Sequence, residues 1–170
     1  MLQEMDYRIV SADADRGAEI KDFVLAQMGD LYPPGTYYEN PHDLMFFEEV
    51  YIRSPNACFF IAEDASGVII GTAAVRPYDR RFPEVEPALG SGPVCEIVKF
   101  YIHPDKRRKG IGARLYAQAE RFAREAGYAE SCLHTSLYLP GGYPFWQSRG
   151  YLQRYWESEV IVHMSKRWGM

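Results

Sequence analysis

The spacing of hydrophobic residues predicts that the chain opens with a strand and two helices and continues with a hairpin. Residues 7–10 form a short run that predicts a strand, and a short helix is expected over residues 42–54. A longer helix is predicted between these two segments, because apolar residues occur at helical spacing, at Ile20, Phe23, Val24 and Met28. Residues 57–78 hold two runs of β-branched and aromatic residues around a turn at residues 64–67, which is typical of a hairpin.

The clearest helix covers residues 112–126, between a strand predicted at residues 94–102 and another near residues 130–137. Its hydrophobic positions follow one another at steps of 4, 4, 3 and 4, at Ile111, Leu115, Ala119, Phe122 and Ala126. A strand, a helix and a strand in this order predict a right-handed crossover between parallel neighbours, whereas the hairpin predicts antiparallel pairing.

The rest of the pattern predicts one domain with an exposed excursion and a closing pair of strands. Residues 79–93 contain three Pro and two Gly, so we expect an exposed loop here. A helical turn near residues 145–148 and strands within residues 151–156 and 159–166 complete the order. We therefore predict an α/β fold with a mixed, mostly antiparallel sheet, a central parallel strand pair and flanking helices, in a single domain over residues 1–170.

Composition and charge describe a soluble globular chain and argue against several classes of partner. Of the 170 residues, 47% are hydrophobic and 25% are charged, as in ordinary globular proteins. The net charge of −4 argues against partners that need a broad basic face, such as nucleic acid or an anionic membrane. No apolar run approaches the roughly 18 residues of a membrane span, and the first residues lack the pattern of a secretory signal.

The cysteines and histidines predict neither disulfides nor a metal site. Cys58, Cys95 and Cys132 are odd in number, far apart and set in apolar contexts, which favours reduced thiols and a cytoplasmic location. The four histidines show no paired ligand spacing with one another or with the cysteines, so no metal is expected.

Residues 106–113 combine positive charge, glycine and the start of a helix. Four cations come first and glycines follow, in the order Lys106, Arg107, Arg108, Lys109, Gly110, Ile111 and Gly112. The first N–H groups of a helix lack partners and carry partial positive charge, and glycine lets the backbone approach an anion closely, so we expect a phosphate or pyrophosphate site. The alternative is a tight turn beside solvated cations. A P-loop is excluded because Ala113 follows Gly112, and a dinucleotide fingerprint because Leu115 takes the place of its third glycine.

The segment RRKGIG, residues 107–112, resembles the Gln/Arg-x-x-Gly-x-Gly/Ala loop of the GNAT superfamily of N-acetyltransferases, and the order of elements resembles that family's fold. The resemblance implies that acetyl-CoA is the co-substrate and that a primary amine of a small molecule or peptide is the acceptor. Carried over residue by residue, the contacts of the preceding strand with the coenzyme fall on Phe100, Tyr101 and Ile102. The contacts of the loop fall on Arg107, Arg108, Lys109, Gly110, Ile111, Gly112 and Ala113.

Glu96 is the candidate general base. An alkyl ammonium has a pKa near 10, so only about 1 in 1000 amines is unprotonated at pH 7 and a base must take the proton. Glu96 lies in an apolar strand beside Cys95 and Ile97, where desolvation makes a carboxylate a stronger base. In histone-type members of the resembled family a glutamate has the same position, eleven residues before the first Arg or Gln of the loop. The alternatives are a structural ion pair, with Lys99 nearby, or a carboxylate that only binds the ammonium group of the substrate.

Tyr143 is the candidate proton donor to the departing thiolate. The resembled family often uses a Tyr four residues before a Gly-aromatic pair, here Gly150 and Tyr151, but Trp146 occupies that position. An indole N–H cannot act as an acid at neutral pH, so the role passes to Tyr143 or to water, and the alternative for Tyr143 is a packing role. Leu139 also stands where many relatives place an Asn near the pantetheine arm.

The sequence does not identify the acceptor. A loop with polar-tipped rings and one acid suits a cationic amine, and its residues are Tyr32, Tyr37, Tyr38 and Glu39. His134 is either a proton relay in the acceptor groove or an ordinary sheet histidine. A non-catalytic acyl-CoA-binding module and an acyltransferase for a larger acyl-CoA are the alternative functions. The aromatic closing strands could support a homodimer.

Overall fold

The structure is a computed structural model that describes residues 6–107 and 109–168. Its centre is one seven-stranded sheet in the order β1-β2-β3-β4-β5-β7-β6. The strands are β1 (Tyr7–Ser11), β2 (Cys58–Asp64), β3 (Ile69–Pro77), β4 (Val94–Ile102), β5 (Glu130–Ser136), β6 (Leu152–Trp156) and β7 (Ile161–Arg167). β4 and β5 pair in parallel, and the other neighbours in the described sheet are antiparallel. The predicted fold class is therefore confirmed.

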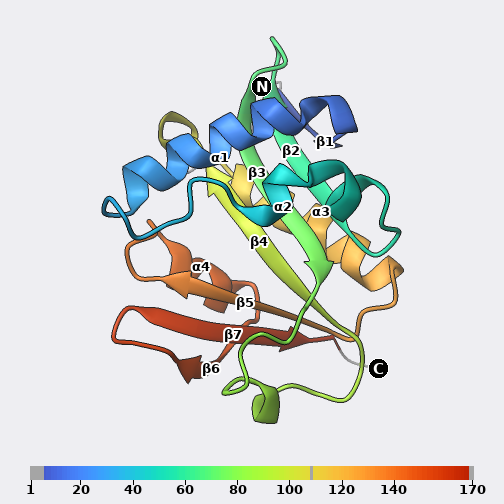
Figure 1. Ribbon diagram of the computed structural model, residues 1–170, viewed down its shortest axis with the longest axis vertical. Helices are drawn as coiled ribbons and strands as arrows, with labels where there is room; N and C mark the ends of the chain where they lie inside the picture. Colours follow the sequence, from blue (N-terminus) through green and yellow to red (C-terminus); the bar gives the residue numbers. More distant parts are fainter. Residues whose placement is uncertain (1–5, 108, 169–170) are drawn as a thin grey trace, which may run out of the picture.

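Helices cover both faces of this sheet (Figure 1). The longer helix α1 (Gly17–Leu31) and the short α2 (His42–Met45) lie on one face, and α3 (Ile111–Glu125) lies on the other. The helix α4 (Gly142–Ser148) packs beside β5. Four short helical segments lie in the connections, η1 (Ala14–Arg16), η2 (Glu48–Ile52), η3 (Glu86–Ala88) and η4 (Pro104–Lys106).

Alternating side chains of the central strands divide the core into two layers. On β2, Phe60 packs in the layer that contains Leu115 of α3, and Phe59 packs in the layer that contains Val24 of α1. Gly71 lets α3 lie close to β3, because a Cβ at this position would come within 3.0 Å of Leu115 Cδ1. The face of α3 predicted from the sequence is buried or partly buried, at Ile111, Leu115, Ala119, Phe122 and Ala126.

The parallel strands β4 and β5 are joined only at their starts. Their register contains three residue pairs, Val94 with Glu130, Cys95 with Ser131 and Glu96 with Cys132. On the other edge of β4 a bulge places both Lys99 and Phe100 opposite Ala73 of β3, and Lys99 has φ 53. This left-handed conformation costs a residue other than glycine roughly 1–2 kcal/mol. A bulge bends its strand and increases the twist, so β4 turns away from β5 and leaves an opening in the middle of the sheet.

The second predicted helix is the element that differs most from the structure. Residues 42–54 form two pieces, α2 and the π-helical segment η2, because Phe46 leaves the helical conformation with φ −112 and ψ 43. The rings of Phe47 and Tyr51 both pack edge-on against Phe59 of β2, with centroids 5.4 and 5.1 Å away. Packing of two aromatic rings on one partner decides the local geometry here, where the hydrophobic pattern alone predicted a regular helix.

Residues 79–93 form the predicted excursion, in which most residues are exposed or partly exposed and a few pack on the sheet. Val85 is 2% exposed, and Phe82 lies edge-on against His163 of β7 with ring centroids 4.6 Å apart. The main-chain N–H of Gly90 donates to Glu130 Oε1 at 2.7 Å, which holds the loop against the start of β5. The loop therefore forms part of the wall beside the opening between β4 and β5.

Candidate active site

Two cavities open where β4 and β5 separate. The smaller cavity, of about 440 Å³, lies at the start of α3. The larger one, of about 980 Å³, is lined by residues of α1, α2 and the 79–93 loop as well as by β4 and β5. Four residues line both cavities, which are therefore two parts of one opening: Phe100, Tyr101, Leu139 and Trp146.

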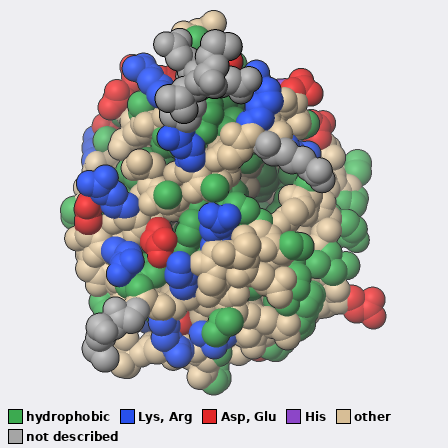
Figure 2. All heavy atoms as spheres, turned by 180° about the vertical axis from the view of Figure 1, so that it is seen from behind, with side chains coloured by type: hydrophobic (Ala, Val, Ile, Leu, Met, Phe, Trp, Pro, Cys, Tyr) green, Lys and Arg blue, Asp and Glu red, His purple; other side chains and the backbone are tan. Residues whose placement is uncertain are grey.

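The smaller cavity has the geometry of an anion site. Gly110 has φ +80, a left-handed conformation that glycine adopts without strain, and it turns the chain into α3. Arg114 N donates to Gly110 O at 3.2 Å, so the N–H groups of residues 111–113 have no acceptor within the helix. Figure 2 views the molecule from this side, and Lys and Arg side chains are spread over the face with hydrophobic side chains between them.

Most of the predicted cofactor residues come together in the smaller cavity. Its lining includes Phe100, Tyr101, Ile102, Arg107, Gly110, Ile111, Gly112 and Ala113. Lys109 is not among the lining residues, and Arg108 lies outside the described residues. The main chain of Ile102 faces the opening, because the next residue, His103, donates its N–H to Ile70 O beside β3 and successive strand residues alternate in direction.

Trp146 forms the wall between the two cavities. It is 5% exposed, and its ring lies 4.9 Å from Phe100, 5.7 Å from Tyr116 and 5.2 Å from Tyr151, measured between centroids. Edge-on aromatic contacts at these distances hold the rings in fixed positions. Trp146 therefore sets the width of the passage between the cavities.

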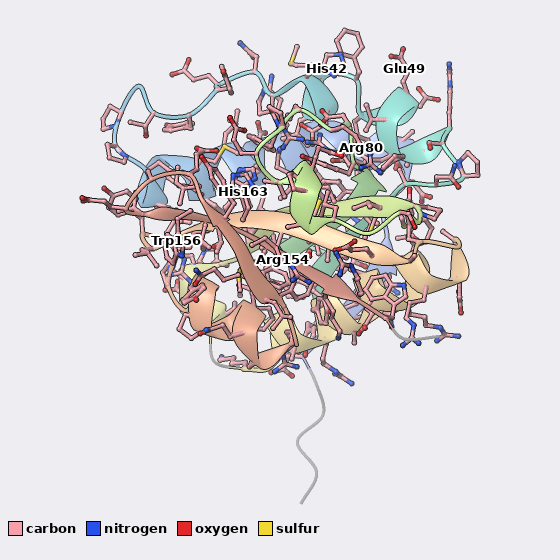
Figure 3. All side chains as sticks on the ribbon, turned by 90° about the horizontal axis from the view of Figure 1, so that it is seen from below. His42, Glu49, Arg80, Arg154, Trp156 and His163 are labelled. Carbon is pink, nitrogen blue, oxygen red and sulfur yellow. The ribbon has the colours of Figure 1, made fainter. Side chains whose placement is uncertain are left out.

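The structure does not bring Tyr143 to either cavity. It belongs to α4, and its hydroxyl donates to Gln153 Oε1 on β6 at 3.1 Å. Its ring lies 5.7 Å from the ring of Trp156, which Figure 3 shows at the β6 side of the molecule. These contacts are those of a residue that packs α4 on β6.

Glu96 lies at the last parallel pair of β4 and β5, and it is 2% exposed. Arg81 of the 79–93 loop holds both of its oxygens, with Nη1 2.8 Å from Oε1 and Nη2 2.7 Å from Oε2. Arg76 of β3 adds Nη2 at 3.3 Å from Oε1. The sequence suggested Lys99 as an ion-pair partner, but Lys99 instead lies beside Asp43. The two-point pair with Arg81 is the stronger type of ion pair and occupies both carboxylate oxygens.

A second buried acid, Asp43 of α2, extends this network. Its Oδ2 accepts a hydrogen bond from the Tyr51 hydroxyl at 2.6 Å and lies 3.3 Å from Lys99 Nζ and 3.5 Å from Arg76 Nη1. Burial by itself raises the pKa of Asp43, but Lys99, the Tyr51 hydrogen bond and Arg76 outweigh it, so the pKa is lowered. Burial also lowers the pKa of Lys99, against the attraction of Asp43. Because Arg76 touches both acids, the two ion pairs form one network.

The larger cavity is charge-balanced. Its lining contains the cations Arg76, Arg81 and Lys99 and the acids Asp43, Asp79 and Glu157. A cavity with equal numbers of cations and acids has no net charge with which to attract a ligand that carries several positive charges. The site therefore differs from the acidic cleft that would attract a polycation.

The aromatic loop before α2 contributes three of its four predicted recognition residues. Tyr32, Tyr37 and Tyr38 line the larger cavity, whereas Glu39 is exposed and is not among the lining residues. Burial raises the pKa of Tyr32, so its hydroxyl is a neutral hydrogen-bonding group at pH 7.

Sequence reasoning missed Asp43, Arg76 and Arg81. One signal for Arg76 was available, because antiparallel pairing of β3 with β4 places Arg76 directly opposite Glu96. Asp43 and Arg81 come from α2 and from the 79–93 loop, and no spacing rule connects these segments to β4. Arg80, just before Arg81, has φ 63, so a strained residue lies next to the one that holds Glu96.

The described residues offer few other reactive groups. Cys58, Cys95 and Cys132 are free thiols, and burial raises the pKa of Cys95 to about 12. Within residues 6–107 and 109–168, no group of three or more His, Cys, Asp or Glu side chains is arranged to hold a metal ion. None of the helices in this part of the chain is long and apolar enough to cross a membrane.

Comparisons with known proteins relate the chain to one family. A model of the Acetyltransferase (GNAT) family matches residues 22–151. The chain is 28% identical over 114 residues to the aminoglycoside N(6')-acetyltransferase type 1 of Klebsiella aerogenes, a match that covers 66% of this chain and 70% of that protein. The chain spans less than half the length of other curated relatives, N-acetyltransferases from Xenopus tropicalis and mouse.

Solved structures share the fold over nearly the whole chain. The GNAT-family acetyltransferase of Staphylococcus aureus superposes with a TM-score of 0.76 at 15% identity, over 95% of this chain and 98% of that one. The PaiA N-acetyltransferase of Thermoplasma acidophilum, solved with coenzyme A, superposes with a TM-score of 0.71 at 18% identity, over 96% of this chain and 100% of that one. At these identities the likeness concerns the fold.

Proposed function

Because the chain belongs to the GNAT family of acetyltransferases, we propose that it transfers the acetyl group of acetyl-CoA to a primary amine. Family membership makes the protein an acetyl-CoA-dependent acyltransferase, and the acceptor and the residue roles are the content of the proposal. The observation that carries it is the joined pair of cavities at the point where β4 and β5 separate. One cavity presents main-chain N–H groups to an anion, and the other surrounds an acceptor with rings and charges.

The smaller cavity is the proposed site of the coenzyme. Two features favour binding of a pyrophosphate here. The first N–H groups of α3 have no acceptor within the helix, and Gly110 makes a left-handed turn. The pantetheine arm is proposed to lie along the edge of β4, where the smaller cavity is lined by Phe100, Tyr101 and Ile102. The coenzyme A found with the Thermoplasma acidophilum protein, whose fold this chain shares, supports the choice of ligand.

The reaction we propose is direct attack by the acceptor nitrogen on the thioester carbonyl. The thioester would lie at the passage between the cavities, beside Trp146. The carbonyl oxygen becomes negative in the tetrahedral intermediate, and the main-chain N–H of Ile102, which faces the opening, is a suitable donor to it. A fixed donor of this kind often contributes the largest single share of the rate enhancement.

General-base help is assigned to the region of Glu96, which lies behind the lining residues Arg81 and His134 of the larger cavity. Glu96 is the buried carboxylate nearest to the point of strand separation, which supports this assignment. Glu96 is 2% exposed and both of its oxygens accept hydrogen bonds from Arg81, so a more exposed group beside it is better placed to meet the acceptor directly.

The acceptor we propose carries one amine and is not a polycation. The Klebsiella aerogenes relative is named for aminoglycosides, which carry several ammonium groups. In this chain three cations and three acids line the acceptor cavity, so it has no excess negative charge to attract a ligand with several ammonium groups. The rings of Tyr32, Tyr37 and Tyr38 instead favour a monoamine with an apolar or aromatic body.

Two measurements on the purified protein test this function. Calorimetry with coenzyme A should show uptake, and a panel of amines with acetyl-CoA should show thiol release. We expect more release with monoamines and peptides than with polyamines and aminoglycosides. Absence of coenzyme A uptake would contradict the proposal. Uptake without thiol release from any amine would favour the acyl-CoA-binding module, and faster release from succinyl-CoA than from acetyl-CoA would favour the larger donor.

A further inference from the structure

His134 lies at the point where the two strands diverge, on the acceptor side of the opening. It is two residues beyond Cys132, the last residue of β5 that pairs with β4, and it lines the larger cavity. The side chain of His134 is 39% exposed, whereas that of Glu96 is 2% exposed. A ligand in this cavity therefore meets the imidazole before it meets the carboxylate.

Neighbouring rings hold the imidazole in place. His134 pairs directly with His163 across β5 and β7, and their ring centroids are 5.3 Å apart. Phe82 of the 79–93 loop lies edge-on against both rings, at 5.5 Å from His134 and 4.6 Å from His163. His163 is in turn fixed by Glu157 Oε1, 3.0 Å from its Nε2. Figure 3 shows His163 on the side of the sheet where the loop that carries Arg80 lies.

Desolvation of the His134 ring in the cavity wall favours its neutral form. Burial lowers the pKa of His134 to about 4, and His163 and Arg81 act in the same direction. Glu96, whose Oε2 lies 3.9 Å from His134 Nδ1, and Glu157 act in the opposite direction and are outweighed. A neutral imidazole has a free lone pair at pH 7, and because its pKa is low it holds a proton only transiently, with the Glu96 carboxylate nearby to favour the imidazolium.

We propose that His134 is the catalytic residue that takes the proton from the acceptor nitrogen as it attacks the thioester, and that Glu96 is a positioning residue behind it. The inference rests on the proposed acetyl transfer. With both Glu96 oxygens held by Arg81, the open base at the strand divergence is the His134 ring. An Nδ1–H directed toward Glu96 leaves Nε2 as the acceptor, and the carboxylate stabilises the imidazolium that forms.

The proton and electron balance of this step is simple. The amine lone pair forms the N–C bond, and the π electrons of the carbonyl move to its oxygen. The N–H bond then breaks, and its proton goes to Nε2 of His134. A lone pair on the oxygen re-forms the carbonyl, the C–S bond breaks, and the thiolate leaves with the electron pair of the C–S bond. The imidazolium releases its proton to solvent, and the thiolate takes one from solvent, so the products are the amide and the thiol.

Two substitutions and one rescue experiment test the role of His134. For His134→Gln and His134→Ala we expect kcat to fall by about 10²-fold or more, the usual contribution of a general base, with the affinity for coenzyme A unchanged. Added imidazole should restore part of the rate of His134→Ala, and more basic imidazoles should restore more. His103→Gln, which removes a histidine outside both cavities, should gain nothing from imidazole.

Several results would overturn the assignment. One is a kcat of His134→Gln within about twofold of the wild type. Another is a His134→Ala protein that binds coenzyme A normally, so that it is folded, yet gains no rate from any imidazole. Wild-type protein that binds coenzyme A and releases no thiol with any amine would instead refute the proposed acetyl transfer itself. If only the role of His134 is wrong, the wild-type protein still releases thiol with an amine.

Discussion

The two sides of the opening between β4 and β5 are built by different means. On the α3 side, the proposed coenzyme site is lined by residues that lie close together in the chain, the end of β4 with residues 106–107 and 110–113. On the acceptor side, charged side chains arrive from separate segments, with Asp43 from α2, Arg76 from β3 and Arg81 from the 79–93 loop. One side depends on local backbone conformation, and the other depends on tertiary structure.

This difference predicts how each side responds to change. A main-chain site keeps its geometry when neighbouring side chains are replaced, but it loses function when new atoms fill the space next to the backbone. A network of buried charges loses stability when any member is removed, because the partner is left without compensation. The predictions below test this contrast.

Removal of the Glu96 charge should have the largest effect on folding. Glu96→Gln removes the two-point partner of Arg81 and leaves it only its contact with the exposed Asp79, so we expect the free energy of unfolding to fall by about 3 kcal/mol, the lower end of the range for broken buried ion pairs. The lower end applies because the Arg81 side chain is 33% exposed. Urea unfolding followed by tryptophan fluorescence measures the change. The double variant Glu96→Gln with Arg81→Met should lose less than the sum of the two single losses, and simple additivity would contradict the network.

Filling the space at Gly112 should weaken the coenzyme without unfolding the protein. For Gly112→Val we expect the Kd of coenzyme A to rise about tenfold or more, which corresponds to about 1.4 kcal/mol of binding free energy. The fold should tolerate the change, because a Cβ at this position would make ordinary contacts, 3.7 Å from Phe145. Ala117→Val on the exposed side of the same helix is the control and should keep the wild-type Kd. Equal affinities for the two variants would place the coenzyme elsewhere.

The acceptor side should also be sensitive to acid. Because folding lowers the pKa of Asp43, its contribution to stability is present above the ordinary value of 3.8 and is lost as the pH falls through the lower folded-state value. Asp43→Asn removes this titration, so its free energy of unfolding should decline less steeply than that of the wild type below about pH 4. Urea unfolding at a series of pH values gives both slopes. Parallel curves for the two proteins would contradict the role of the Asp43 ion pairs.

The smallest effect is expected at Tyr143, the predicted proton donor to the thiolate. Its hydroxyl donates to Gln153 and lies outside both cavities, so Tyr143→Phe should change kcat by less than about twofold and lower stability by about 0.5–1.5 kcal/mol at most. Thiol release at saturating acetyl-CoA measures the rate. A fall of tenfold or more would restore Tyr143 to the proton transfer and require α4 to move during turnover.

The fold and most of the lining of the smaller cavity could be predicted because their signals are local. The strand predicted at residues 94–102 is β4, and Gly110 and Gly112 lie where the sequence pattern places them, at the start of α3. Alternating and helical spacing report which face of each element is buried, and left-handed turns require residues such as Gly110.

The acceptor side could not be predicted in the same way, because its contacts join residues far apart in the chain. Glu96 was recognised as an acid in an apolar strand, but its partner Arg81 lies in a loop whose path depends on Gly90 and Glu130. The break after α2, which places Asp43 beside Lys99, depends on aromatic packing against Phe59. Hydrophobic spacing contains no information on such pairs, which follow only from the assembled sheet.

At the bulge, the extra backbone residue Lys99 matters for keeping β4 apart from β5, independently of its side chain. With one residue fewer, the end of β4 would pair regularly with β3, and Tyr101 and Ile102 would keep their partners Thr72 and Gly71 while the local bend of the strand was lost. A deletion here should leave the sheet able to form while closing the gap beside β5. In an alignment of related chains, a missing residue at this position would therefore identify members that have kept the architecture and lost the passage for a thioester.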